Sequence, residues 1–92
     1  MSVRADYVTL RVLSEQMHEA AKAECWNDLD QLRIKQESML AALPSPTQAD
    51  RPHLESALSE LDAAMRLASA RREQISTLLT AFRHKIQSPL GA

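Results

Sequence analysis

The stretch from residue 54 to residue 86 decides the fold, and it reads LESALSELDAAMRLASARREQISTLLTAFRHKI. Apolar side chains recur in it at three- and four-residue spacings, which is the period of an amphipathic helix. The stripe consists of Leu54, Leu58, Leu61, Met65, Ala68, Ile75, Leu79, Phe82 and Ile86. The pattern predicts one helix over residues 51–86, about 50 Å long at the rise of an α-helix.

A loop is predicted before this helix, over residues 44–50. Pro44 and Pro46 each remove a backbone donor, and each disfavours helical geometry in the residue before it. Asp50 is suited to cap the helix that follows, with Pro52 in its first turn.

Two further stripes occupy the first half of the chain. One comprises Tyr7, Leu10, Leu13, Met17, Ala20 and Ala21, and the next comprises Trp26, Leu29, Leu32, Gln36, Leu40 and Leu43. They predict helices over about residues 3–24 and 26–43, joined by a tight corner. The expected architecture is all-α: an antiparallel three-helix bundle in which a helical hairpin packs along a long third helix.

Composition agrees with a single helical domain spanning residues 1–92. The chain has 92 residues, too few for a catalytic domain beside a regulatory one. Helix-forming residues are abundant and the one glycine is Gly91, so the glycine turns of a β-rich fold are lacking. A chain this short buries a modest core, which a partner or a second copy would supplement.

The charge pattern argues against nucleic acid and membrane as partners. The formal net charge is -1, although the last third is basic, with Arg66, Arg71, Arg72, Arg83 and Lys85 against Glu73. Phe82 is the one aromatic residue available there for base stacking, so solvated charges or an acidic protein partner are favoured. With neither an apolar span of about 20 residues nor a signal core, the cytoplasm is the expected location.

Catalytic chemistry is not supported by the residue pattern, and neither a metal nor a cofactor is expected. His18, His53 and His84 lie on three different predicted elements, and Glu15 with His18 lacks the second such pair that a carboxylate-bridged metal site needs. Cys25 is the only cysteine, and its acidic neighbours disfavour a thiolate.

One enzymatic alternative comes from a short likeness. The fragment Leu29, Asp30, Leu32, Arg33 is similar to the first helix of the all-α chorismate mutases, which are also short three-helix chains. Those enzymes direct several cationic side chains into one dianion pocket. Here the cationic side chains are concentrated late in the predicted third helix, which argues against a chorismate-mutase-like enzyme.

Some apolar side chains fall outside the stripes. Val8 and Val12 lie opposite the first stripe and Ile34 lies off the second, so these three are candidate contacts of a homodimer or simply exposed side chains. Leu67 and Leu78 widen the third stripe, either for packing between two helices or for a groove that receives an amphipathic helix.

The stretch around the predicted corner reads Ala23, Glu24, Cys25, Trp26, Asn27, Asp28 and Leu29, followed by Leu32, Met39, Leu40 and Leu43, and the long helix includes Arg71, Gln74, Ile75, Leu78 and Leu79. Together these residues resemble the FliT family of flagellar export chaperones. The resemblance covers most of the chain. The family often has an arginine where this chain reads Lys35, Gln36, Glu37 and Ser38. Longer members carry a fourth helix over the binding groove, which is not expected in a chain that stops at Ala92.

The resemblance implies a cytoplasmic chaperone, not an enzyme, that binds the C-terminal helical segment of the filament-cap protein and hands it to the flagellar type III export ATPase. The residues expected to line the groove are Met39, Leu43, Leu67, Ile75, Leu78 and Phe82. Arg71 and Arg72 are expected to steer an acidic segment of the client or the ATPase. The alternative is a homodimeric helical adaptor joined through Val8, Val12 and Ile34.

Overall fold

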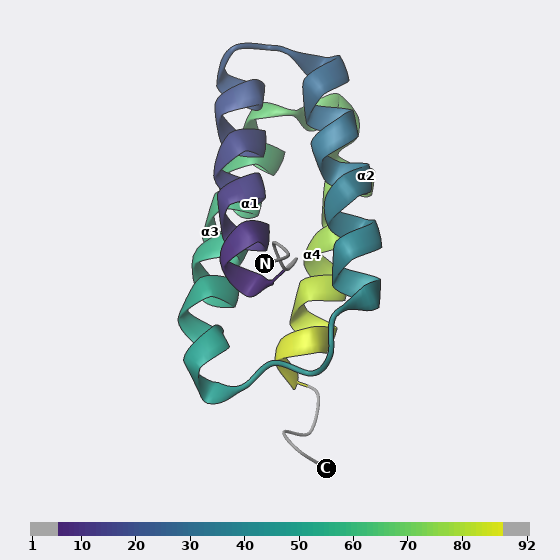
Figure 1. Ribbon diagram of the computed structural model, residues 1–92. Coiled ribbons are helices and arrows are strands. Elements are labelled where there is room, and N and C mark those ends of the chain that lie inside the picture. Colours follow the sequence, from purple (N-terminus) through teal and green to yellow (C-terminus); the bar gives the residue numbers. More distant parts are fainter. Residues whose placement is uncertain (1–5, 88–92) are drawn as a thin grey trace, which may run out of the picture.

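The computed structural model describes residues 6–87, which form four α-helices and no strand. Chain direction alternates from each helix to the next, giving an up-and-down bundle (Figure 1). The helices are α1 (Tyr7–Lys22), α2 (Trp26–Ala42), α3 (Arg51–Leu67) and α4 (Arg72–Gln87). Helix α1 packs most extensively on α3, and α4 lies against α3 and α2. The all-α prediction is therefore confirmed, but the three-helix arrangement is not.

The predicted third helix is two helices that run in opposite directions. The chain leaves helical geometry at Ala68, where φ is -112° and ψ is 61°, and a short 3₁₀ turn (Ser69–Arg71) leads into α4. Residues 68–71 are called the elbow below. A straight 50 Å helix would extend far beyond the 16-residue α1 and leave half of its stripe in water. The reversal lets both halves bury that stripe, so residues 6–87 form four helices where three were predicted.

Local signals explain where the first helices start and stop. The Asp6 carboxylate caps α1 by accepting the Thr9 backbone N–H at 2.9 Å. At its other end the Glu24 N–H donates to the Ala21 carbonyl and the Cys25 N–H to the Ala20 carbonyl, with Glu24 at φ 58°. These two bonds form a Schellman motif, a left-handed stop that ends α1 and turns the chain into α2.

The segment between α2 and α3 crosses the lower end of the bundle (Figure 1). Asp50 precedes α3 as predicted, but its carboxylate makes no cap bond to that helix; it accepts the Thr47 N–H at 2.9 Å and so closes the 3₁₀ turn Gln48–Asp50. The Tyr7 hydroxyl donates to the Pro44 carbonyl, and the Lys85 ammonium donates to the Leu43 carbonyl at 2.7 Å. The crossing is thus tied to α1 and to α4.

All four helices contribute to one hydrophobic core. Its members are Tyr7, Leu10, Met17, Ala20, Ala21, Leu29, Leu40, Leu54, Ala57, Leu61, Ala64, Ala68, Ile75, Leu78, Leu79 and Phe82. A polar contact is buried with them: the Gln36 side-chain amide donates to the Ser14 hydroxyl at 2.6 Å and to the Leu10 carbonyl at 2.8 Å. A buried polar pair of this kind favours one register of α1 against α2.

Replacing Tyr7 by phenylalanine is expected to lower the free energy of unfolding by about 1 kcal/mol, because the Pro44 carbonyl loses its donor. The loss should depend on pH.

Burial, and then the nearby Asp50 carboxylate, raises the pKa of Tyr7 in the folded protein. As pH rises, the tyrosine therefore ionises in the unfolded chain before it ionises in the folded one. The tyrosine's contribution is complete at neutral pH and is lost as pH rises above about 10. Urea unfolding at pH 7 and above pH 10 measures it, and a wild-type to Y7F gap that widened at high pH would contradict the assignment.

Candidate partner-binding groove

An open groove runs between α2 and α4 on the surface of the bundle. Its volume is about 420 Å³ and its lining is mostly apolar. The residues that line it are Glu37, Leu40 and Ala41 on α2 and Thr77, Ala81, His84 and Lys85 on α4. This α2/α4 groove lies over the contact between α2 and α4. The packing of α2 against α4 is less extensive than the packing of α1 against α3.

The shape of the α2/α4 groove follows from the sizes of its side chains. Leu40 is 3% exposed and forms the floor, whereas Ala41 and Ala81 keep the walls low. Small side chains at such positions let the backbone of another helix approach closely. Ile34 is 50% exposed and lies one turn before Glu37, so it extends the same side of α2. A partner helix would therefore meet apolar surface over two to three turns.

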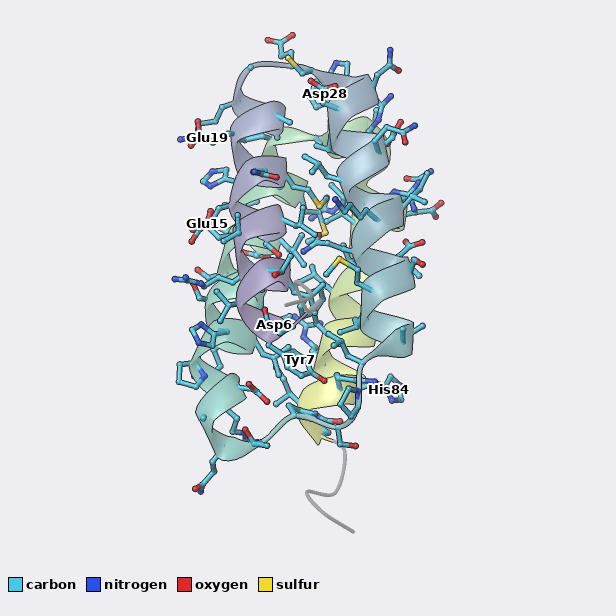
Figure 2. All side chains as sticks on the ribbon, in the orientation of Figure 1. Asp6, Tyr7, Glu15, Glu19, Asp28 and His84 are labelled. Carbon is cyan, nitrogen blue, oxygen red and sulfur yellow. The ribbon has the colours of Figure 1, made fainter. Side chains whose placement is uncertain are left out.

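Charged groups stand at the rim of the α2/α4 groove. The Arg33 guanidinium pairs with the Glu37 carboxylate at 2.9 Å, and Lys85 is held by the Leu43 carbonyl. His84 projects from the last turns of α4 near the lower end of the bundle (Figure 2). The rim thus carries both signs of charge around an apolar floor, an arrangement suited to an amphipathic protein segment.

A second set of contacts fixes the upper end of α4. The Arg71 guanidinium pairs with the Asp30 carboxylate at 3.1 Å and lies over the Trp26 ring, 5.3 Å from its centroid. These three residues, called the latch below, join the elbow to the start of α2. Together with the bond from Lys85 to Leu43, the latch holds α4 beside α2 at both ends and so keeps the walls of the groove in place.

Replacing Arg71 by alanine is expected to lower the free energy of unfolding by about 1 kcal/mol, because a partly exposed ion pair and a cation–π contact are lost together. Urea unfolding measures this loss, which should shrink at high salt because screening weakens the pair in the wild type. The matched control is Arg66→Ala. Arg66 pairs with Asp62 at 3.0 Å on one exposed helix face, and losing that pair should cost a few tenths of a kcal/mol. Equal losses of stability in the two variants would show that the latch stabilises the fold no more than an ordinary exposed ion pair does.

The residues predicted to bind a partner are spread over the bundle and do not share one surface. Ile75, Leu78 and Phe82 are each 0% exposed and point into the core. Met39 and Leu43 are partly buried against the core near the lower end of α2. Leu67, Arg71 and Arg72 lie around the elbow at the opposite end, where Leu67 is 49% exposed.

The predicted dimer contacts also separate. Val8 and Val12 are 42% and 38% exposed on the face of α1 turned away from the core. Ile34 is 50% exposed on α2, one turn before the groove residue Glu37. Sequence reasoning missed Ala41, Thr77 and Ala81, whose one signal is that they are small residues flanking the apolar stripes.

The side chains considered as metal ligands or catalytic groups are not brought together in the structure. Within residues 6–87, no three His, Cys, Asp or Glu side chains are grouped so that they could hold a metal ion. Nδ1 of His18 lies 2.8 Å from the Glu60 carboxylate, which joins α1 to α3. Glu15 and Glu19 project from the outer side of α1 (Figure 2), and a hydrogen bond from Lys22 lowers the pKa of Glu19. Cys25 is exposed at the α1–α2 corner.

Comparison with known proteins identifies the family. The family model described as flagellar protein FliT matches residues 4–89, nearly the whole chain. The chain belongs to the FliT family. Searches of curated proteins and of solved structures gave no match. The resemblance seen in the sequence is thus confirmed, and FliT is a family of flagellar proteins, not of enzymes. None of the helices in residues 6–87 of this FliT-family chain has the length and apolar character to cross a membrane.

Proposed function

We propose that this FliT-family protein is a cytoplasmic export chaperone that holds the C-terminal helical segment of the filament-cap protein and hands it to the flagellar type III export ATPase. The open apolar groove between α2 and α4 is the observation that carries this proposal. An export client must stay unassembled until it is secreted. A chaperone can ensure this by covering the apolar face through which the client would assemble.

The α2/α4 groove suits one amphipathic helix in particular. Such a helix presents anchors one turn apart, and the exposed Ile34, the Leu40 floor and the low wall at Ala81 offer apolar contacts along the groove. The polar face of the client would lie toward Glu37 and Lys85 at the rim. Affinity then comes mainly from the apolar anchors.

A second way of binding uses the buried residues predicted from the sequence. A client could contact Ile75, Leu78 and Phe82 or the face beneath them only if α4 left the core. In the described conformation the latch and the Lys85 bond hold α4 in place. The α2/α4 groove requires no such rearrangement, so we assign the client to the groove.

Handover to the ATPase would use the exposed arginines beside the elbow. Arg66 and Arg72 are exposed there, whereas Arg71 is engaged in the latch. Exposed cations of this kind mainly raise the rate of association with an acidic surface, so ATPase binding should weaken as salt rises. The client stays bound at the α2/α4 groove while the other end of the bundle is recognised.

The test is a calorimetric titration of the full chain with the C-terminal helical segment of the cognate filament-cap protein. A one-to-one complex is expected, with a heat-capacity change that is negative because apolar surface is buried. Light scattering of the free and bound protein checks the stoichiometry. If the segment produces neither heat nor a complex, the chaperone proposal fails.

The homodimeric adaptor remains the alternative, favoured by the exposed pair Val8 and Val12 on α1. If that pair is a dimer contact, Val12→Glu should give monomers, because two like charges would be buried at the interface. Light scattering of the wild type and the variant measures this. A wild type that is dimeric, with a variant that stays dimeric, would rule out this face as the interface.

A further inference from the structure

We propose that two copies of this chain can exchange α4, with the elbow straightening so that α3 and α4 become one continuous helix in each copy. In such a dimer, α4 of one copy packs on α2 and α3 of the other. This inference does not rest on the proposed function, and the experiment below measures chain exchange without any client.

The elbow is the one connection among residues 6–87 without a local stop signal. The α1–α2 corner has Glu24 in the left-handed region within a Schellman motif, and the α2–α3 segment has Pro44 and Pro46. The elbow reads Ala-Ser-Ala-Arg and is flanked by Leu67 and Arg72. All of these residues are compatible with a helix, and alanine is the best helix former.

Little backbone change separates the bent and the straight forms. Ala68 departs from helical geometry, while Ser69–Arg71 already form a 3₁₀ turn and Arg72 has helical φ and ψ. Rotating Ala68 into the α region would let the N–H groups of the following residues donate to carbonyls four positions earlier. Ala68 and Ile75 lie seven residues apart, so the apolar stripe stays in helical phase across the elbow, although Arg71 and Arg72 stand between them.

A straightened chain needs a second copy. Ile75, Leu78, Leu79 and Phe82 are at most 2% exposed, and straightening would carry all four into water while uncovering the core beneath α4. A second straightened copy offers the same vacant face and the same helix, so every contact of α4 can form again between chains. Short connections that can extend in this way are a known route to exchange.

The exposure of Leu67 fits the same picture. Leu67, the last residue of α3, is 49% exposed, whereas the other large aliphatic side chains of that helix are buried or half-buried. It lines a small cavity of about 130 Å³ with Trp26 and elbow residues. In the exchanged dimer the two long helices pass each other at their elbows, which brings the two Leu67 side chains into an interface.

The test uses a disulfide that reports which chain supplies α4. In a Cys25→Ser background, Ala41→Cys on α2 and Ala81→Cys on α4 place one thiol on each wall of the α2/α4 groove. The protein is unfolded, refolded at low or at high concentration, oxidised, and separated by size. Dimers from concentrated refolding should run at twice the chain mass on a non-reducing denaturing gel, and monomers at the single mass. Dimers that run at the single mass, or the absence of dimer at the highest soluble concentration, would overturn the exchange.

A glycine at the elbow gives a second test. Ala68→Gly should lower the dimerisation constant roughly thirtyfold, because glycine disfavours the straight helix in both chains while accepting the bent geometry. The matched control is Ala63→Gly in α3, a position that is helical in both forms, and it should leave the constant unchanged. Equal effects of the two glycines would show that the elbow does not straighten.

Discussion

Replacing Phe82 by alanine is expected to lower the free energy of unfolding by about 3 to 5 kcal/mol. Phe82 is 0% exposed on α4 and packs into the core shared by all four helices, so truncation leaves a cavity as well as removing apolar area. A domain of this size has a total stability of only about 5 to 10 kcal/mol. Urea unfolding followed by far-UV circular dichroism measures the loss, and the variant should be partly unfolded at physiological temperature.

The control for Phe82 lies on the opposite side of the same helix. Thr80 is exposed, and its hydroxyl bonds only to the Ser76 carbonyl within α4, so Thr80→Ala should change stability by less than about 0.5 kcal/mol. A Phe82→Ala cost below 1 kcal/mol would mean that α4 is not docked as described. That result would also remove one wall of the α2/α4 groove.

Replacing Ala41 by arginine is expected to weaken binding of the client segment at least tenfold. Ala41 is exposed and lines the α2/α4 groove, so a long charged side chain would occupy the space of the client helix. It would also leave a charge to be desolvated on binding. Arginine is a good helix former at an exposed position, so the fold should be unaffected. Calorimetric titration gives the change in affinity, and circular dichroism confirms the helix content.

Ala42→Arg is the matched control, because Ala42 is the next residue on α2, is also exposed and does not line the groove. It adds the same side chain and the same charge about 100° around the helix. The two variants should therefore differ by about tenfold in affinity for the client. If both weaken binding equally, the effect comes from charge alone, and if neither does, the client binds elsewhere.

The sequence predicted most of the helical structure, because apolar periodicity is a local property. The stripes of the first two helices and the prolines at 44 and 46 lie where the structure has α1, α2 and the segment before α3. The elbow could not be predicted in the same way, since Ala68 and its neighbours all favour a helix. Its bend is imposed by tertiary packing, which buries both halves of one stripe in a short bundle.

The groove was harder to predict than the fold, for a physical reason. Periodicity marks the side chains that face the core, so Ile75, Leu78 and Phe82 were selected and are buried. An open groove is lined by the positions beside the stripe, where small residues such as Ala41 and Ala81 leave room. One sequence cannot distinguish these alanines from ordinary exposed alanines until the helices that carry them are placed side by side.

The most direct test of the central claim is to map the client's binding site by amide chemical shifts. The full chain is labelled and titrated with the C-terminal helical segment of the cognate filament-cap protein. We predict shifts concentrated at Leu40, Ala41, Thr77 and Ala81, with those of Val8 and Val12 unchanged. Shifts confined to α1 would contradict the groove assignment, and loss of the α4 signals from their folded positions would show that the client displaces that helix instead.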